Sequence, residues 1–183
     1  NSLLDTLVFG RRSGAHAADA VRGLHMPEPG RAALDAEAGR IDSIVRRDRS
    51  GRRVSEIKAE LGQVMDKYVA VFRDEARLQT ALETVRRLKE EAENVAIDDR
   101  GSVFNQDVLG ALELQFMLDN AECIVISALE RKESRGAQYR TDFPSRNDEE
   151  WLKHINVAVN GSEPEISYSE VTMTQWEPQE RTY

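Results

Sequence analysis

The chain has 183 residues, of which 40% are hydrophobic and 32% charged, and its formal net charge is −8. This length suffices for one fair-sized domain, or for a helical domain with a smaller appendage. The negative charge argues against a nucleic-acid partner, because phosphate binding requires clustered positive charge. No apolar run approaches the ~20 residues of a membrane span, so we expect a soluble body.

The first predicted element is a helix over residues 2–24. Asn1 or Ser2 is a suitable N-cap, and Asp5 lies in the first turn, where a carboxylate suits the positive end of the helix dipole. Apolar residues recur there at steps of three and four: Leu3, Leu4, Leu7 and Val8. The chain starts within this helical pattern and without Met, so we expect it to be part of a longer protein.

A boundary is predicted at Pro27, Pro29 and Gly30, because these residues interrupt the helical pattern. A short amphipathic helix is predicted after it, over residues 32–46. Its inward-facing residues are expected to be Leu34, Ile41, Ile44 and Val45.

Three long helices follow, and each carries an apolar stripe at helical spacing. The stripe of the first is Val54, Ile57, Leu61, Met65, Tyr68 and Phe72; that of the second is Leu78, Leu82, Val85, Leu88, Ala92 and Val95. The third, over residues 106–133, carries Val108, Leu112, Phe116, Ala121, Ile124 and Leu129. Because the connections are short, sequential helices should be antiparallel neighbours in a three-helix bundle.

The helical period ends at Arg135, after which glycines and prolines punctuate the chain. Residues 148–154 are predicted to form one or two helical turns. Residues 155–159 and 166–173 alternate as short strands do, and Asn160-Gly161 is a suitable hairpin turn. The predicted fold class is mainly α: an antiparallel three-helix bundle, similar to a spectrin repeat, with an N-terminal helix and a small irregular C-terminal region containing short β-strands.

No catalytic or metal-ligating group stands out in the sequence. The histidines His16, His25 and His154 lack the spacing of metal ligands, and no Cys-x-x-Cys or Gly-x-Gly-x-x-Gly motif occurs. The single cysteine, Cys123, excludes an internal disulfide and lies in an apolar helical stretch, which favours a buried packing role. The residues alone therefore predict no catalytic residue and no metal site.

One stretch of the sequence carries a close resemblance. Glu133–His154 reads ESRGAQYRTDFPSRNDEEWLKH. It resembles the signature E-S-R-G-A-H-x-R-x-D-[FY]-P-x-R-D-D-x-x-W-x-K-H of succinate dehydrogenase and fumarate reductase flavoproteins. The departures are Gln138, where His is usual, and Asn147, where Asp is usual. Residues 1–14 resemble the family's N-S-L-L-D-x-x-V-F-G-R-x-x-G, and YVAVFR at 68–73 and LEL at 112–114 also fit.

The resemblance implies a division of the chain and a cofactor. Residues 1–29 would be the terminal helix of the FAD-binding domain, 30–134 the three-helix bundle, and 135–183 the small C-terminal region. Ser2 and Leu3 match residues that contact FAD at a helix N-terminus, where free N–H groups favour negative charge on the flavin. The alternative is that Ser2 only caps the helix. The family's other FAD-binding and substrate-binding residues precede the matched part, so we expect this chain alone to be inactive and to bind no FAD.

The family also implies a reaction and partners. The parent enzyme would oxidise succinate to fumarate with FAD, in the tricarboxylic acid cycle and electron transport, and pass electrons to an iron–sulfur subunit and quinone. This part would contact the FAD-binding and capping domains, the iron–sulfur subunit and membrane anchor subunits, peripherally on the cytoplasmic side of the inner or plasma membrane. The alternatives are a fumarate reductase, an L-aspartate oxidase, or a non-enzymatic helical-bundle interaction module.

The alternating Arg and Asp residues of 135–154 are expected to be structural. They should tie an irregular segment to the FAD-binding domain through ion pairs, with Arg140 paired to Asp142 or Asp148. Without that domain, we expect the first helix either to pack on the bundle or to self-associate through Leu4, Val8 and neighbouring apolar residues.

Overall fold

The computed structural model describes residues 2–47, 50–160, 163–176 and 178–179. The chain divides into two compact units, Asn1–Arg40 and Ile41–Tyr183. The first contains helix α1 (Ser2–Ala20) and the start of α2 (Arg31–Arg46); the second contains all the other elements. Both predicted N-terminal helices are present, although the first ends four residues earlier than predicted. The predicted N-cap at Asn1 lies outside the described residues.

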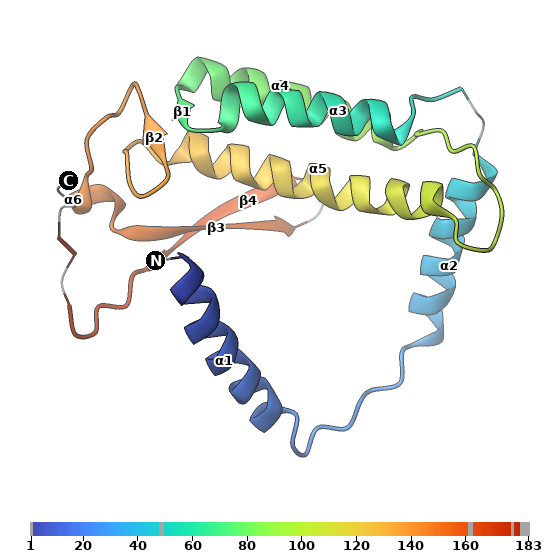
Figure 1. Cartoon of the computed structure of the whole chain (residues 1–183), viewed down its shortest axis with the longest axis horizontal. Coiled ribbons are helices and arrows are strands. Elements are labelled where there is room, and N and C mark those ends of the chain that lie inside the picture. The colour runs from blue at the N-terminus through green and yellow to red at the C-terminus, as the bar shows by residue number, and fades with distance from the viewer. Residues whose placement is uncertain (1, 48–49, 161–162, 177, 180–183) are drawn as a thin grey trace. The chain divides into compact units, whose positions relative to one another are not determined.

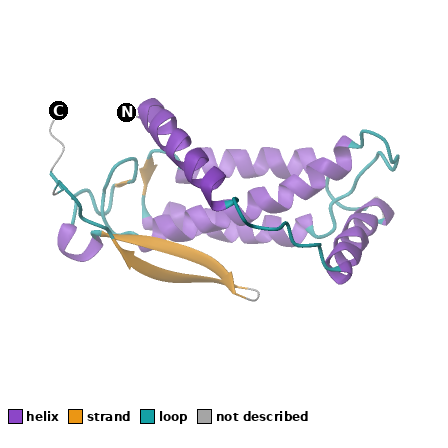
Figure 2. Ribbon diagram, turned by 90° about the horizontal axis from the view of Figure 1, so that it is seen from below, coloured by secondary structure: helices purple, strands orange, loops and turns teal. Residues whose placement is uncertain are grey.

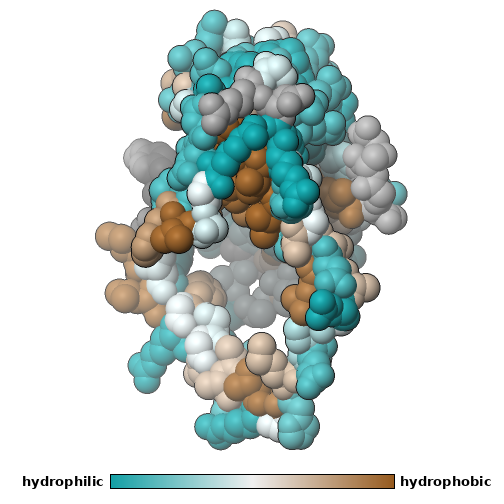
Figure 3. Space-filling view, turned by 90° about the vertical axis from the view of Figure 1, so that its right-hand side faces the viewer, coloured by the Kyte–Doolittle hydropathy of each residue, from teal (hydrophilic) through white to brown (hydrophobic). Residues whose placement is uncertain are grey.

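The apolar residues of α1 and α2 are largely exposed. Leu3, Leu7 and Phe9 are exposed on α1, and Leu34 and Ile41 are exposed on α2. The prediction that Leu34 and Ile41 face inward was therefore wrong. In α2 the burial is confined to its C-terminal turn, where Ile44 is fully buried and Val45 half-buried. Brown, hydrophobic side chains also reach the surface on the face drawn in Figure 3.

Three helices lie side by side in the second unit and alternate in direction (Figures 1 and 2). They are α3 (Val54–Val64), continued by the π-helix η1 (Met65–Val69), α4 (Glu75–Ala92) and α5 (Gln106–Glu130). Side-chain caps mark two of the starts: Asp74 accepts from the Arg77 N–H and Asn105 from the Val108 N–H, each at 2.9 Å. The predicted antiparallel three-helix bundle is thus confirmed.

The bundle core is apolar and consists of two clusters of buried side chains, a larger one and a smaller one around Leu78 and Val125. Its fully buried residues include Ile57 from α3, Val85 and Leu88 from α4, and Leu114 and Leu118 from α5. Each such side chain contributes about 1.5–3 kcal/mol through burial. Glu122 is a buried carboxylate between α4 and α5, where Arg86 and Lys89 neutralise it at 3.0 and 2.6 Å.

Two predicted stripes differ from the observed core. In the first helix the π-helical turn adds residues per turn, so the buried positions shift from the predicted ones to Val64 and Val69. Phe72 then lies in the short strand β1 (Phe72–Arg73) and is 62% exposed. In α5, Phe116 and Ile124 are exposed, because α5 is apolar on two faces and the stripe at Ala111, Leu114, Leu118 and Val125 is the buried one.

The C-terminal region is built from short elements beside the bundle. Strand β1 pairs in parallel with β2 (Tyr139–Arg140), and α6 (Asp148–Trp151) precedes the antiparallel hairpin of β3 (Lys153–Asn160) and β4 (Glu163–Glu170). The predicted helical turn and paired strands are confirmed. The first strand is longer than predicted, and the second lies three residues earlier in the chain than predicted. Gly161 of the predicted turn lies outside the described residues. Within the described residues, we find no helix with the length and hydrophobicity that crossing a membrane requires.

Candidate functional site

The segment Glu133–His154, which we call the signature segment, is anchored to the bundle by Arg140. This side chain is fully buried. Its Nη1 donates to the carbonyl oxygens of Ala128 (2.9 Å) and Leu129 (3.2 Å), in the last turn of α5. Carbonyl groups at a helix C-terminus have no partner within the helix. Arg140 therefore supplies the donors that the end of α5 lacks, and places positive charge where the helix dipole favours it.

Asp142 neutralises this buried guanidinium and links it to a second helix. Its two carboxylate oxygens accept from Nε and Nη2 of Arg140 at 2.8 and 2.7 Å. One of them also accepts from the Glu75 N–H (3.0 Å), at the first residue of α4. The hydrogen bonds from Arg140 are the main cause that lowers the pKa of Asp142 to about 2. A two-residue motif thus joins the end of α5 to the start of α4.

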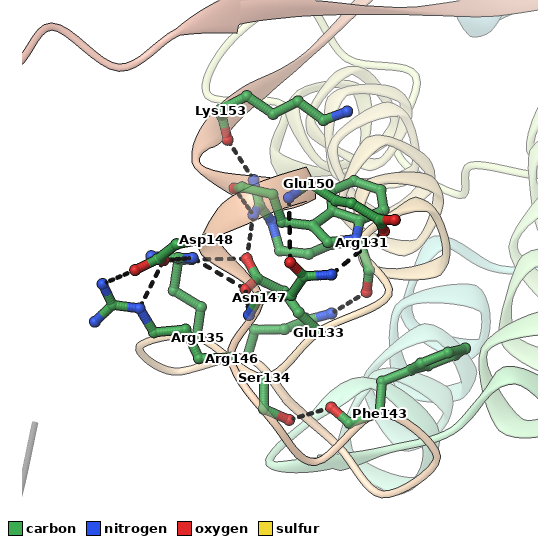
Figure 4. Close-up of polar contacts among 12 residues, drawn as sticks. Arg131, Glu133, Ser134, Arg135, Phe143, Arg146, Asn147, Asp148, Glu150 and Lys153 are labelled. Carbon is green, nitrogen blue, oxygen red and sulfur yellow. Dashed lines mark hydrogen bonds and ion pairs between the residues drawn. The ribbon is translucent and has the colours of Figure 1, made fainter. Parts of the chain in front are cut away.

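A second buried carboxylate, Glu133, organises the start of the signature segment (Figure 4). It accepts from Arg131 (2.6 Å), from Nε of Arg135 (2.7 Å) and from the Asn147 N–H (2.8 Å). Burial by itself raises the pKa of Glu133, but these hydrogen bonds outweigh it and the pKa is lowered. Glu133 therefore remains ionised and holds the two ends of the loop 133–147 together.

The outer layer of this cluster is more exposed. Asp148 accepts from Arg135 and from Nε of Arg146 (2.7 Å), and these guanidinium groups hold its pKa well below the usual range. Arg131 donates to the carbonyl oxygens of Trp151 (2.9 Å) and Lys153 (2.7 Å), which fixes α6 and the start of β3.

These contacts decide between the predicted ion pairs. The pair of Arg140 with Asp142 is confirmed, whereas Arg140 with Asp148 is wrong, because Asp148 binds Arg135 and Arg146 instead. The described contacts of Arg140 and Asp142 run to α5 and α4 of the bundle. The cause is local, because the C-terminus of α5 and the N-terminus of α4 lie next to the segment and offer it backbone groups without partners in the helix. Ties from this segment to the FAD-binding domain stay a prediction.

A cleft of about 600 Å³ opens between α5, β1 and the start of β3. We call it the arginine cleft. Its lining comprises Arg73, Asn120, Cys123, Ile124, Ser127, Ala128, Arg131, Arg135, Gln138, His154 and Ile155. It contains three guanidinium groups and no carboxylate among these residues. Such a surface suits an anionic group.

Gln138 links two parts of the lining of this cleft, Arg73 and the last turn of α5. Its amide oxygen accepts from Nη1 of Arg73, and its amide nitrogen donates to the Ala128 carbonyl oxygen at 3.1 Å. The sequence prediction missed the role of Arg73, although this residue ends the YVAVFR stretch that resembles the family. The YVAVFR motif was the one feature of the sequence that pointed to a role for Arg73.

Other predicted residues lie in different surroundings. Cys123 is half-buried and lines the arginine cleft, so it is not the buried core residue that we expected. His154 also lines the cleft, whereas His16 and His25 are exposed on the first unit. Ser2 and Leu3 lie in the first turn of α1; Leu3 is 81% exposed, and the Ser2 side chain is outside the described part. Their contact with FAD stays a prediction.

Comparisons with known proteins agree with the resemblance. A family model described as "Fumarate reductase flavoprotein C-term" matches residues 58–183. The fumarate reductase flavoprotein subunit of Haemophilus influenzae is 38% identical over 188 residues, covering 100% of this chain and 31% of that protein. The succinate dehydrogenase flavoprotein subunit of Rickettsia bellii is 34% identical over 177 residues, covering 95% of this chain and 29% of the relative.

A solved structure has the same fold. It is an E. coli quinol fumarate reductase with a mutated FrdA; the match has a TM-score of 0.84 at 32% identity and covers 98% of this chain and 32% of that one. The chain spans about a third of the length of the relatives that it matches.

Proposed function

Since this chain belongs to the family of succinate dehydrogenase and fumarate reductase flavoproteins, we propose that it serves an FAD-dependent enzyme that interconverts succinate and fumarate. Its own role would be that of a scaffold and a subunit contact. The observation that carries this proposal is the extent of the match: the likeness to the relatives covers the bundle, the signature segment and α1 together.

The geometry supports a scaffold role. The helix ends near the signature segment are tied by Arg140 and Asp142, which fixes α4 and α5 relative to each other. Outer residues of α5 such as Phe116, Met117 and Ile124 remain exposed in this chain. Exposed apolar side chains on one helix favour contact with another protein surface. We propose that FAD-binding and capping domains, an iron–sulfur subunit and membrane anchor subunits provide such surfaces in the parent complex.

The start of α1 is the part of this chain that we expect to meet FAD, the electron and hydride acceptor in such enzymes. The first N–H groups of a helix lack intrahelical acceptors and favour an electron-rich partner. Ser2 and Leu3 stand at this position, and Leu3 is exposed. Asp5 in the same turn partly offsets the positive end of the dipole. We therefore assign Ser2 and Leu3 a contact that positions FAD, and no role in proton transfer.

Succinate oxidation is our leading assignment of direction, with fumarate reduction as the alternative, because relatives of both names match the chain. A chimera tests the proposal. The matching region of the Haemophilus influenzae subunit would be replaced by this chain, and the purified protein assayed for bound flavin and for fumarate reduction by a reduced dye. We expect the chimera to contain bound flavin and to reduce fumarate. A folded chimera that binds no flavin would contradict the assignment.

The chain alone provides the complementary experiment. Titration with FAD, followed by flavin fluorescence, should show no binding, and addition of succinate with an electron acceptor should give no turnover. Tight flavin binding by this chain would mean that its own residues form the pocket, and our division of roles would fail.

A further inference from the structure

We propose that the arginine cleft binds an organic carboxylate. The central observation is Arg73, a half-buried guanidinium whose hydrogen-bond acceptors are all neutral. Its Nε donates to the Val69 and Ala70 carbonyl oxygens at 2.7 and 3.0 Å, and its Nη1 donates to Gln138. Its Nη2 donates to no group in the described part of the chain. Burial lowers the pKa of Arg73, and among the described residues no ion pair of Arg73 with a carboxylate offsets this loss of hydration.

The carboxylates near the cleft are too few to neutralise its other arginines. Arg131 and Arg135 share one buried carboxylate, that of Glu133, and Arg135 shares Asp148 with Arg146. Four guanidinium groups, counting Arg73, therefore face two carboxylates in this neighbourhood. In a chain whose net charge is −8, this is a local excess of positive charge beside an open cleft.

The shape and lining favour a carboxylate with an apolar body over an inorganic anion. A guanidinium can hold a carboxylate through two of its nitrogen atoms. In Arg73 these would be Nη2, together with the second N–H of Nη1, whose other N–H donates to Gln138. Beyond Arg73, the walls include the aliphatic side chains of Ile124, Ala128 and Ile155. A volume of about 600 Å³ lies within the usual range of ligand pockets. Two sources supply this chemistry: a free organic acid, and the side chain of an acidic residue in another polypeptide segment.

The experiment separates these two sources. This chain, labelled with 15N, would be titrated with butyrate and with the capped peptide Ala-Leu-Glu-Leu-Ala, following the Arg73 Nε–Hε signal and the Ser127 amide. Butyramide and the peptide with Gln for Glu are the neutral controls. We expect at least one carboxylate ligand to bind at least tenfold more tightly than its neutral counterpart. Butyrate binding would indicate a free acid, and binding of the peptide alone would indicate a side chain.

Two variants on α5 locate the binding. Ile124→Glu places a tethered carboxylate in the cleft lining, and Phe116→Glu makes the same change on an exposed residue outside it. Ile124→Glu should weaken carboxylate binding at least tenfold, and Phe116→Glu less than threefold. Equal loss in both variants, or no preference for carboxylate over amide in the intact chain, would overturn the proposal. Arg73→Lys, which keeps the charge but removes the fork, should weaken binding about fivefold or more; an unchanged affinity would contradict the role of Arg73.

This inference uses only residues of the second unit and does not depend on the proposed function. A chimera that fails to bind flavin leaves the cleft intact, and a cleft that binds no carboxylate leaves the family assignment intact. The two results are therefore distinguishable.

Discussion

The bundle and the signature segment are held together by different forces. In the bundle, residues such as Leu88 and Leu114 are fully buried against other apolar side chains, and their contribution scales with apolar area. In the signature segment, Arg140 and Glu133 are just as deeply buried, but their neighbours are charged groups and backbone carbonyls. We therefore expect the first region to lose stability gradually as contacts are removed, and the second to lose stability sharply when any one partner is removed.

This difference follows from the energy of an unpaired group. Removing a methyl group from an apolar core costs the lost burial and leaves a cavity. Removing one member of a buried ion pair leaves the other member without water and without a partner. The segment should therefore be the more fragile of the two, and the more sensitive to pH.

The largest effect should come from Arg140→Ala. This change removes the guanidinium from the Leu129 and Ala128 carbonyl oxygens and leaves the Asp142 carboxylate without its cationic partner. Gln138 still donates to Ala128 and the Glu75 N–H to Asp142, but neither replaces the lost charge. We therefore expect a loss of about 3–5 kcal/mol in the free energy of unfolding. Urea denaturation followed by circular dichroism measures it. Arg146→Ala is the matched control in the outer layer of the cluster, where a much smaller loss is expected because solvent screens the ion pair with Asp148. Equal losses for the two arginines would mean that burial of the ion pair is not decisive.

A core truncation probes the other region. Leu114→Ala removes a fully buried side chain from α5, and about 2–5 kcal/mol should be lost, depending on how far the neighbouring helices close the cavity. Phe116→Ala, two residues along the same helix, removes a side chain that is 59% exposed and should cost much less. If the Phe116 variant were the weaker of the two, the exposed face of α5 would contribute to folding of this chain.

The same contrast explains what the sequence predicted. Regular spacing of apolar residues predicted the helices, their order and the bundle, and residues such as Leu78 and Val85 are buried as expected. The errors lie where the period fails: at the π-helical turn before Phe72, and on α5, whose two apolar faces gave no reason to prefer Leu114 over Phe116. The signature segment has no regular spacing of apolar residues, so it was recognised from the family resemblance alone.

The site was predictable only in part, for a similar reason. Short-range pairing of Arg140 with Asp142 follows from their proximity in the sequence, and it was predicted. Contacts of Arg140 with the end of α5, and of Arg73 with Gln138, join residues that are brought together by the folded bundle. Such contacts depend on helix positions that spacing alone does not define.

Acid should weaken the signature segment before the bundle core. Because the pKa of Asp142 is lowered to about 2 in the folded chain, its contribution is present above the ordinary carboxyl pKa and is lost as the pH falls from about 4 to 2. We expect this contribution to be about 1–2 kcal/mol, given its partial exposure. Asp142→Asn should be less stable than the natural chain at pH 6, and the difference should shrink as the pH approaches 2. A difference that is independent of pH would show that the charge of Asp142 is not responsible.

The smallest effect, and the most specific one, concerns Gln138, which stands where the family usually has His. Gln138 accepts from Arg73 and donates to the Ala128 carbonyl oxygen. A neutral histidine can do both, because one ring nitrogen accepts while the other donates. Gln138→His should therefore change the free energy of unfolding by less than about 1 kcal/mol at pH 8, as measured by urea denaturation.

Protonation would distinguish the two side chains. An imidazolium cannot accept from Arg73 and would add positive charge beside Arg131 and Arg135, so its pKa in the folded chain should lie below the unfolded value of about 6.5. A group with a lowered pKa of this kind destabilises the fold as the pH falls below the unfolded value. The Gln138→His chain should lose stability between about pH 7 and 5, whereas the natural chain should not. If both chains respond equally, the hydrogen bond from Arg73 does not hold this part of the cleft, and the positive charge gathered there is better tolerated than the contacts of the signature segment imply.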